Sequence, residues 1–324
     1  MCTAVAYVTN NLFFGRTLDY DRSYGEGVTM TPRRFPLRFR SGMILERHHA
    51  IIGMACVAEG YPLYYDGMNE KGLAMAGLNF TESAVYSPAV PDRDNVAHFE
   101  FIPWILGQCA SVREAKSLLE RLNLTDVSFS PELPVARLHW LIADREESVT
   151  VEAVREGLMV IPNPVGGLTN EPPFETQLFR LNDYMHLTPE QPENRFSDSL
   201  ALKVYSRGMG ALGLPGDLSS VSRFVRASFV KMNSLSGPSE EESVTQFFHI
   251  LGAVEQQRGC CLVVEGKYEI TRYTSCCSAA SGIYYYTTYD NRQITAVDLH
   301  REDLEGVCLR RYPLELKQQI KKQN

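Results

Sequence analysis

Two apolar runs at the start of the chain, residues 2–9 and 12–17, set the strongest limit on how it can fold. Both contain β-branched and aromatic residues, and the dipeptide between them, Asn10-Asn11, tolerates the positive φ of a tight turn. The pattern predicts a β-hairpin that brings the chain back alongside its own beginning. Residues that end the second run are therefore expected to lie beside the N-terminus.

Cys2 carries the most chemistry in this hairpin. If Met1 is removed, which the small side chain of Cys2 allows, Cys2 holds a thiol and a free α-amine on one carbon. An α-amine titrates near pH ~8, so a neutral fraction can take the thiol proton directly or through one water molecule. The thiolate is then a nucleophile. The plain alternative is a small buried cysteine in a first strand, with Met1 retained.

Two charged residues at the end of the second run favour the nucleophile. Arg16 and Asp19 follow the turn closely enough to reach Cys2 in a short hairpin. A neighbouring cation stabilises a thiolate, and a carboxylate can hold the ammonium or orient the amine. The hairpin therefore predicts a small charged cluster around the N-terminus.

Several later segments resemble a known family when they are taken in order with the hairpin. They are Met1-Cys2-Thr3, residues 14–19, 66–73 and 76–80, Leu168-Thr169-Asn170, residues 213–217 and Ser222-Arg223-Phe224. Together they resemble the choloylglycine hydrolases, N-terminal nucleophile hydrolases that include bile salt hydrolases and penicillin V acylases. The resemblance runs from residue 2 to the tyrosine- and threonine-rich stretch 284–289, which is nearly the whole chain.

The resemblance implies a catalytic set and a reaction. The implied residues are Cys2, Arg16, Asp19, Asn79, Asn170 and Arg223. Cys2 would attack an amide carbonyl and form a thioester, while its α-amine accepts the thiol proton and returns it to the leaving amine. The two asparagines would stabilise the oxyanion, Asp19 would fix the amine, and the two arginines would keep the thiolate charged. No metal or organic cofactor is expected.

The residues alone leave simpler alternatives open at three of these positions. Asparagines such as Asn79 and Asn170, at a strand end or before prolines, usually serve turn chemistry, and Arg223 on an apolar-patterned helix is usually a surface charge or an ion pair. The resemblance favours a catalytic role for these three residues. Asn79 also distinguishes between two kinds of enzyme in the family. Bile salt hydrolases carry asparagine at this motif position, whereas penicillin V acylases tend to carry tyrosine.

A conjugated bile salt has a rigid steroid as its acyl group, so the substrate pocket should be largely apolar. Loops at residues 60–66 and 124–137 are expected to supply its walls, because the first is aromatic and the second contains two prolines. The predicted wall residues are Leu18, Ala58, Tyr61, Tyr65, Val127, Phe129 and Leu133.

Strands at both ends of the chain and helices between them predict a single α+β domain over residues 2–324. Strands are expected at 2–9, 12–17, 50–57, 72–78, 138–144, 148–154, 158–161, 261–264, 270–276, 282–288 and 293–298. Helices are expected at 98–109, 111–122, 174–185, 219–232 and 239–251. The resemblance implies more: a four-layer αββα sandwich of two antiparallel sheets covered by helices, assembled as a homotetramer.

Composition excludes some partners. The net charge of −7 and the lack of a basic stripe give no reason to expect nucleic-acid binding, and the basic stretch 31–40 is expected to be a solvated loop or a subunit contact. No charged leader and no apolar run of ~20 residues is seen, so we expect a cytoplasmic protein away from membranes. Its 8 cysteines are then expected to be thiols. Two adjacent pairs occur, Cys260-Cys261 and Cys276-Cys277, and one cysteine of each pair is expected to pack in a core.

The sequence leaves two kinds of alternative function open and disfavours a third. The same chemistry could act on penicillin V or on an N-acyl homoserine lactone, and the scaffold could serve a non-catalytic binding protein that keeps Met1. A papain-like peptidase is disfavoured, because no Cys-Gly-Ser-Cys-Trp motif occurs and none of the 7 histidines shows a convincing partner in the sequence.

Overall fold

The predicted N-terminal hairpin is confirmed in the computed structural model, which describes residues 1–324 with Met1 in place. β1 (Cys2–Val8) and β2 (Leu12–Tyr20) pair antiparallel, with Cys2 opposite Leu18 and Val8 opposite Leu12. The hairpin lies inside a larger sheet, because β1 also pairs with a later strand and β2 pairs with one from the C-terminal part of the chain.

All neighbouring strands of this six-stranded sheet are antiparallel. Their order is β14 (Gly167–Leu168), β1, β2, β17 (Ile270–Ser278), β18 (Ile283–Thr288) and β19 (Asn291–Asp298). Strands from both ends of the chain therefore share one sheet, as the sequence predicts.

A second antiparallel sheet has eight strands. Their order is β13 (Gly157–Pro162), β12 (Ser148–Val154), β11 (Leu138–Ala143), β8 (Ala74–Asn79), β7 (Tyr61–Asn69), β6 (Ile51–Ala58), β3 (Gly27–Thr31) and β20 (Arg310–Pro313). Three two-stranded pairs complete the strands: β4 (Leu37–Arg38) with β5 (Ile44–Leu45), β9 (Asp94–Ala97) with β10 (Leu122–Thr125), and β15 (Leu262–Val264) with β16 (Lys267–Tyr268).

Five α-helices begin at recognisable signals or end at turns. They are α1 (Phe101–Gln108), α2 (Val112–Leu119), α3 (Phe174–Arg180), α4 (Ser220–Asn233) and α5 (Glu240–Gly252). Ser111, Ser219 and Ser239 each accept a hydrogen bond from a backbone N–H of the first turn, as expected of N-cap serines. The predicted helix 174–185 is shorter than expected, because α3 ends at Arg180 and a 3₁₀ turn follows.

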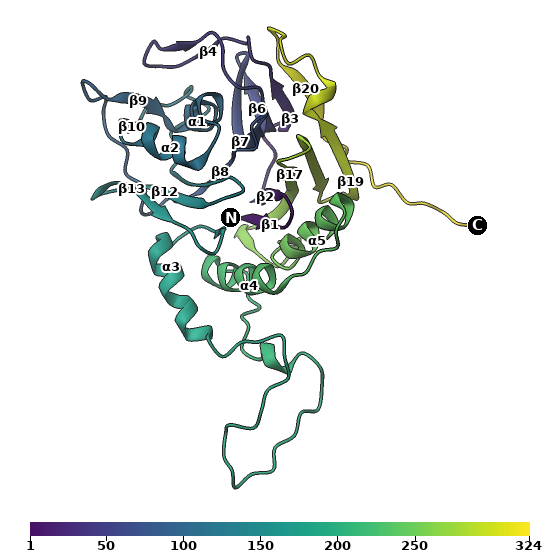
Figure 1. The fold of residues 1–324 in the computed structure, drawn as a ribbon. Helices are drawn as coiled ribbons and strands as arrows, with labels where there is room; N and C mark the ends of the chain where they lie inside the picture. Colours follow the sequence, from purple (N-terminus) through teal and green to yellow (C-terminus); the bar gives the residue numbers. More distant parts are fainter.

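The sheets and helices form the expected four layers, which Figure 1 shows in side view. One core lies between the two sheets, where residues such as Ala4 and Phe14 meet Ile52 and Ala76. A second core lies between the eight-stranded sheet and the first two helices. A third lies between the six-stranded sheet and α4 and α5. The predicted αββα sandwich is confirmed.

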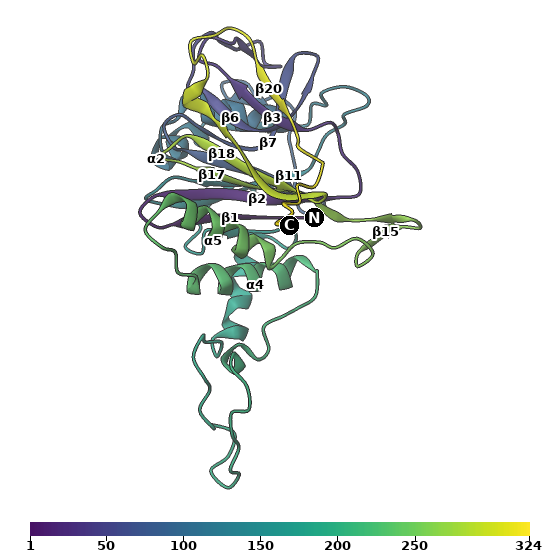
Figure 2. The ribbon, with the colours of Figure 1, turned by 90° about the vertical axis from the view of Figure 1, so that its right-hand side faces the viewer.

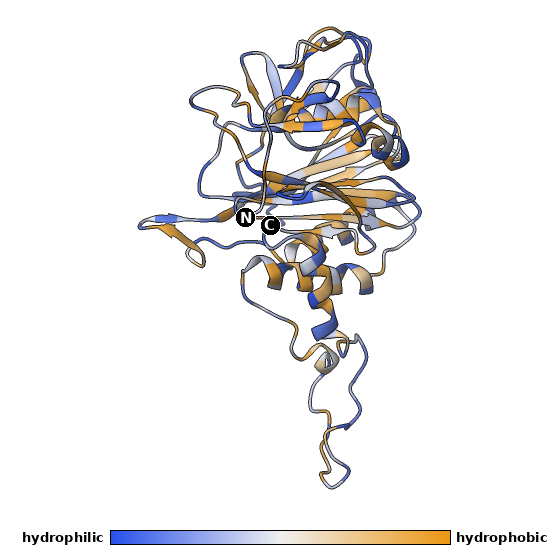
Figure 3. Ribbon diagram, turned by 90° about the vertical axis from the view of Figure 1, so that its left-hand side faces the viewer, coloured by the Kyte–Doolittle hydropathy of each residue, from blue (hydrophilic) through white to orange (hydrophobic).

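Because each sheet is covered on both faces, apolar residues lie on both faces of a central strand such as β1. In β1, Ala4 and Ala6 face the other sheet, while Val5 and Tyr7 face α4 and α5. Hydrophobic residues, orange in Figure 3, accordingly follow the strands in the middle of the molecule.

The prediction of a loop at residues 60–66 is wrong, because this segment begins β7. Only Glu59 and Gly60, both at positive φ, make the turn after β6. A β-bulge at Tyr65 then places Tyr64 toward α1 and Asp66 toward the other sheet. The segment's glycine and aromatic residues suit such a bulged strand as well as they suit a loop.

The cysteine prediction is half correct. Cys276 and Cys277 are both fully buried on opposite faces of β17, in the third and the first core. Cys260 is exposed and Cys261 half-buried in the turn before β15, so neither lies in a core. All eight cysteines are free thiols.

Two segments extend beyond the layers. Between α3 and α4 a long loop, residues 188–210, is closed at its base by a hydrogen bond from Thr188 N to Gly210 O of 3.0 Å. It projects far from the four layers (Figures 1 and 2). The β15–β16 hairpin projects from another side of the molecule (Figure 2).

Candidate active site

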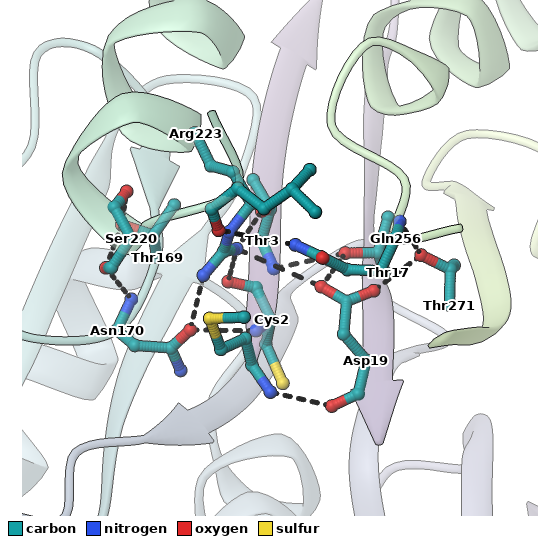
Figure 4. A network of polar contacts seen from close by, with 12 residues as sticks. Cys2, Thr3, Thr17, Asp19, Thr169, Asn170, Ser220, Arg223, Gln256 and Thr271 are labelled. Atoms are coloured by element: carbon teal, nitrogen blue, oxygen red, sulfur yellow. Dashed lines mark hydrogen bonds and ion pairs between the residues drawn. The ribbon is translucent and has the colours of Figure 1, made fainter. Parts of the chain in front are cut away.

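Cys2 is the first residue of β1, and several polar groups converge on its backbone (Figure 4). Its N–H donates to Asn170 Oδ1 at 2.8 Å, and its carbonyl accepts from Arg223 Nη1 at 2.6 Å. These partners lie 168 and 221 residues away in the sequence. Cys2 itself is 2% exposed in the chain that keeps Met1.

Met1 occupies the space next to Cys2. Its amine donates to Asp19 O at 2.7 Å and forms an ion pair with the Glu269 carboxylate. Burial lowers the pKa of the Met1 amine below its ordinary value, although the neighbouring Cys2 and Asp19 groups act in the opposite direction. Burial at this end of the chain thus favours the neutral amine, whereas the ion pair with Glu269 favours the charged one.

Arg223 comes from the first turn of α4 and is completely buried. Besides the Cys2 carbonyl, its guanidinium donates to Thr3 Oγ1 at 2.6 Å and to Asn170 Oδ1 at 2.8 Å. Its nearest carboxylate oxygen is Asp19 Oδ2 at 3.9 Å. Burial lowers the pKa of Arg223, and the Asp19 and Cys2 charges oppose that effect. Arg223 thus fixes the backbone of Cys2 rather than its sulfur.

Asp19, on β2, is also fully buried. Its carboxylate accepts from Thr271 Oγ1 at 2.6 Å and from Thr17 Oγ1 at 3.1 Å. With Met1 in place, the main-chain oxygen of Asp19, rather than its carboxylate, accepts the hydrogen bond from the Met1 amine. The predicted proximity of Asp19 to the N-terminus is present, through a different atom.

Arg16 reaches from the six-stranded sheet to the eight-stranded one. Its Nη1 donates to Tyr65 O at 3.3 Å and to Gly77 O, while Nη2 is buried with no hydrogen-bond partner. Burial by itself would lower the pKa of Arg16, but the Cys2 thiol and nearby acidic groups more than reverse this and raise it. Arg16 therefore keeps a buried NH2 group without a partner, and the charge of Cys2 is the largest of the effects that raise its pKa.

A buried carboxylate that the sequence did not single out lies near Arg16. Asp66 accepts from Tyr273 OH and Tyr284 OH, each at 2.6 Å, and from Ser275 Oγ at 3.1 Å. Burial raises the pKa of Asp66, and Arg16 and the hydroxyl donors oppose the rise. Tyr273 and Ser275 stand two apart in β17 and so share one face of the strand, which is the signal that could have revealed this cluster.

Asn79 and Asn170 lie together, as the resemblance implies. Asn170 Nδ2 donates to Asn79 O at 2.8 Å, which leaves one of its two amide N–H groups free. The side-chain amide of Asn79 makes no hydrogen bond within the chain, and the residue is half-buried at the end of β8. One amide N–H of Asn170 and both amide N–H groups of Asn79 are thus without a partner in the chain.

The predicted pocket walls fall into two groups. Leu18 and Tyr65 pack on the core between the sheets, and Leu18 is opposite Cys2 in the hairpin. Tyr61 packs on the second core, with its ring 6.3 Å from that of Phe129. Ala58 pairs with Tyr61, Leu133 O accepts from Phe129 N at 3.2 Å, and Val127 is exposed. The structure therefore brings Tyr61 and Phe129 together, whereas Leu18 and Tyr65 pack on a different core.

Two hollows of the surface, of about 750 and 390 Å³, lie away from Cys2. One is beside α2 and β13, and the other is beside the turn at 144–148. Neither is lined by a residue of the predicted catalytic set. The polar groups that converge on Cys2 mark the site. With Met1 present, Cys2 itself is almost completely buried.

One histidine has a partner that the sequence did not reveal. His139 Nδ1 lies 2.9 Å from Glu152 Oε1, and both residues are buried. The statement that no histidine has a convincing partner is therefore wrong, although His139 contacts Thr169 O rather than Cys2. The partners are on neighbouring strands, and their pairing depends on register, which the sequence alone did not give.

Other features bear on possible ligands. No group of three or more histidine, cysteine, aspartate and glutamate side chains is arranged to hold a metal ion. All five α-helices fall short of the length and apolar character that a membrane-spanning helix requires.

Comparisons with known proteins agree with this geometry. The model of the choloylglycine hydrolase family, described as linear amide C–N hydrolases, matches residues 2–312. The chain is 56% identical, over 97% of both lengths, to a protein of Lactiplantibacillus plantarum named bile salt hydrolase/transferase. It is 37% identical, over 96% of both lengths, to a protein of Clostridium perfringens with the same name.

Solved structures give the same result. The C2A mutant of the conjugated bile acid hydrolase from Clostridium perfringens superposes with a TM-score of 0.92, at 36% identity and over 100% of both chains. Penicillin V acylase from Agrobacterium tumefaciens shares the fold, with a TM-score of 0.75 at 21% identity over 96% of this chain and 91% of the other.

Proposed function

The chain belongs to the choloylglycine hydrolase family of linear amide C–N hydrolases, and we propose that the amide it hydrolyses joins a bile acid to glycine or taurine. The observation that carries the proposal is the convergence of Asn170 and Arg223 on the backbone of Cys2, together with the buried, unpartnered NH2 group of Arg16. The relatives named above, at 56% and 37% identity, support the substrate class.

The proposal requires that Met1 is removed and that the working domain spans residues 2–324. Cys2 is 2% exposed while Met1 is present, and its nitrogen is then part of a peptide bond. Removal would free both the α-amine and the approach to the thiol. Asn170 Oδ1, which already accepts from this nitrogen, would then hold the amine.

Cys2 would react in two stages. The α-amine takes the thiol proton, and the sulfur attacks the amide carbonyl to give a tetrahedral intermediate. Free amide N–H groups of Asn79 and Asn170 stabilise its oxyanion, and Arg16 Nη2 stabilises the thiolate. The protonated amine gives its proton to the departing glycine or taurine, and water then hydrolyses the thioester.

The same thioester would pass its acyl group to an amine in place of water. Two relatives are named hydrolase/transferase, which supports this second activity. For the acyl group, Leu18 and Tyr65 on one side and Tyr61 and Phe129 on the other are the proposed apolar walls. Tyr61 is the first residue of β7 and packs on the second core, whereas Tyr65 lies in the middle of the strand and packs on the core between the sheets.

Assembly and location are further parts of the proposal. A homotetramer is supported by the long loop 188–210, which exposes several large apolar side chains away from the layers: Phe196, Leu200, Leu202, Val204 and Tyr205. Such surfaces are rare on monomers. A cytoplasmic location is supported by the eight free thiols, which a reducing compartment would preserve.

The test uses purified full-length protein and its Cys2→Ala variant. Intact-mass spectrometry should find a chain lacking Met1, and glycine or taurine should be released from the conjugated bile salts by the wild type only. Release of 6-aminopenicillanic acid from penicillin V and hydrolysis of an acyl homoserine lactone are measured in parallel. A strong preference for either of these would contradict the bile-salt assignment, and a retained Met1 with no turnover would contradict the enzyme.

A further inference from the structure

The buried pair His139–Glu152 lies on neighbouring strands of the eight-stranded sheet, β11 and β12. Their exposed fractions are 0% and 2%. His139 Nδ1 is 2.9 Å from Glu152 Oε1, and His139 Nε2 is 2.7 Å from Thr169 O. Glu152 Oε1 also accepts from Phe174 N at 2.9 Å. Every polar atom of the imidazole is therefore engaged.

The chemistry of these partners fixes where the protons are. Thr169 O is a carbonyl and can only accept, so Nε2 of His139 carries a proton. Nδ1 and the Glu152 carboxylate then share one further proton between them. Since no ring nitrogen remains free, His139 cannot exchange protons with a substrate in this arrangement. Its role must therefore be to keep the residues that it contacts in position.

His139 contacts both segments that carry the asparagines. Thr169, which accepts from its Nε2, immediately precedes Asn170. Phe80, which immediately follows Asn79, stacks on the imidazole with ring centroids 4.3 Å apart and an interplanar angle of 5°. The two asparagines also touch each other through Asn170 Nδ2 and Asn79 O. One buried ring thus lies behind both amide donors.

We propose that His139, supported by Glu152, is a positioning residue that sets the spacing of the Asn79 and Asn170 amides and so their stabilisation of the oxyanion. The inference rests on the proposed function, because it concerns the same reaction. His139 does not touch the substrate. Losing its link should weaken a contact made chiefly in the transition state, so kcat should fall while KM stays nearly constant.

Three variants separate the contributions. H139F keeps an aromatic ring against Phe80 but loses both hydrogen bonds. H139Q keeps an amide that can donate to Thr169 O but loses the stacking. E152Q breaks the pair, because His139 Nδ1 and Phe174 N both contact Oε1 and the amide atom that replaces it cannot donate to the one and accept from the other. The matched control is H48Q: His48 is also buried, and both its ring nitrogens contact backbone carbonyls, of His49 and Phe35.

Release of glycine or taurine is measured at saturating and limiting substrate, well below each variant's melting temperature. Displacing catalytic groups by a fraction of an ångström to one ångström lowers rates by up to about 100-fold. We expect kcat of H139F to fall by about 10- to 100-fold and that of H139Q by about 3- to 10-fold, with KM within about threefold. E152Q should lower kcat in the same direction as H139Q, whereas H48Q should stay within about threefold in both constants.

The outcomes distinguish the two levels of the argument. A wild type that releases no amine from any conjugated bile salt overturns the proposed function. An active wild type whose H139F and H139Q variants keep wild-type kcat overturns the positioning role, as does a fall in kcat that H48Q shares equally. If H139F does not fold, H139Q decides: an unchanged kcat overturns the inference, and a lowered kcat with constant KM supports it.

Discussion

At the scale of single residues, the geometry of Arg223 is the feature that an ordinary substitution should disturb most. Its guanidinium donates in different directions to Cys2 O, Thr3 Oγ1 and Asn170 Oδ1. A lysine ammonium keeps the charge but cannot reproduce this fork, and at least one buried acceptor is left without its donor.

We therefore expect R223K to lower kcat/KM by about 100-fold or more, since the Cys2 backbone and Asn170 lose their common anchor. The measurement is steady-state release of glycine or taurine. Arg226→Lys is the matched control, because Arg226 lies on the same helix and donates only to Pro215 O at 3.2 Å. Equal losses in the two variants would show that the effect belongs to α4 and not to the contact with Cys2.

The amine at the N-terminus gives a second residue-scale prediction, which concerns pH. Burial lowers the pKa of the Met1 amine from 8.0, and we expect the same of the Cys2 amine once Met1 is gone. An amine accepts the thiol proton only when neutral. Activity should therefore be present above the amine pKa and be lost as the pH falls through it.

The profile of kcat/KM against pH should accordingly show an acid limb with its midpoint below 8.0. Asp19 raises the amine pKa, so Asp19→Asn should move the limb to lower pH even though its maximum rate is smaller. A limb above 8.0, or one that Asp19→Asn moves upward, would contradict the amine as the base.

The sequence predicts these residues by different routes and not all of them. Arg16 and Asp19 follow from the hairpin, because only its short turn separates them from Cys2. Asn170 and Arg223 meet Cys2 across 168 and 221 residues, and nothing in local periodicity encodes such contacts. They were reached through the family resemblance, and Asp66 and His139 were missed because each depends on the register between strands or between sheets.

At the scale of the elements, the turn between β7 and β8 depends on one carboxylate. Glu70 accepts from Ala50 N and from Arg33 Nε, each at 2.9 Å. Arg33 lowers the pKa of Glu70 to about 2, from an ordinary value of 4.5. A carboxyl group whose pKa is depressed in the folded state stabilises it above 4.5, and this stability is lost as the pH falls toward 2.

We expect E70Q to lower the free energy of unfolding at pH 7 by about 1–3 kcal/mol, the usual range for hydrogen bonds to a charged group. The difference from wild type should shrink between pH 4.5 and 2, as measured by urea unfolding at several pH values. Glu305→Gln tests the same arginine on its exposed side and should change the free energy of unfolding much less than E70Q does. A constant E70Q effect down to pH 2 would contradict the assignment.

The elements that the sequence predicted well are those with a strong local signal. The serine caps fixed the starts of α2, α4 and α5, and alternating or continuous β-branched runs located most strands. β7 was misread as a loop because Gly60 and Pro62 at its start interrupt the pattern and the bulge at Tyr65 breaks the period of two. β3 and β20 were missed because each is short and its partner lies far away in the chain.

At the scale of the whole molecule, the arrangement of layers leaves one segment without a partner. The loop 188–210 has no sheet or helix layer to cover it, yet Phe196 and Tyr205 on it are each 82% exposed. The hydrogen bond between Thr188 N and Gly210 O closes its base, so its tip is presented as a unit. In an assembly of identical chains, these side chains would be buried against a neighbouring copy.

The double variant F196S/Y205S should therefore reduce the particle mass in size-exclusion chromatography with light scattering, whereas wild type should show the mass of four chains. Replacing exposed aromatics with serine removes the apolar area that drives association and leaves the layers untouched. Val307→Ser is the control, since Val307 is 57% exposed on another part of the surface and should leave the mass unchanged.

A wild type that runs as a single chain at micromolar concentration would exclude the tetramer. An F196S/Y205S variant that keeps the wild-type mass would instead place the interface elsewhere, with the β15–β16 hairpin and its exposed Leu262 as the next surface to test.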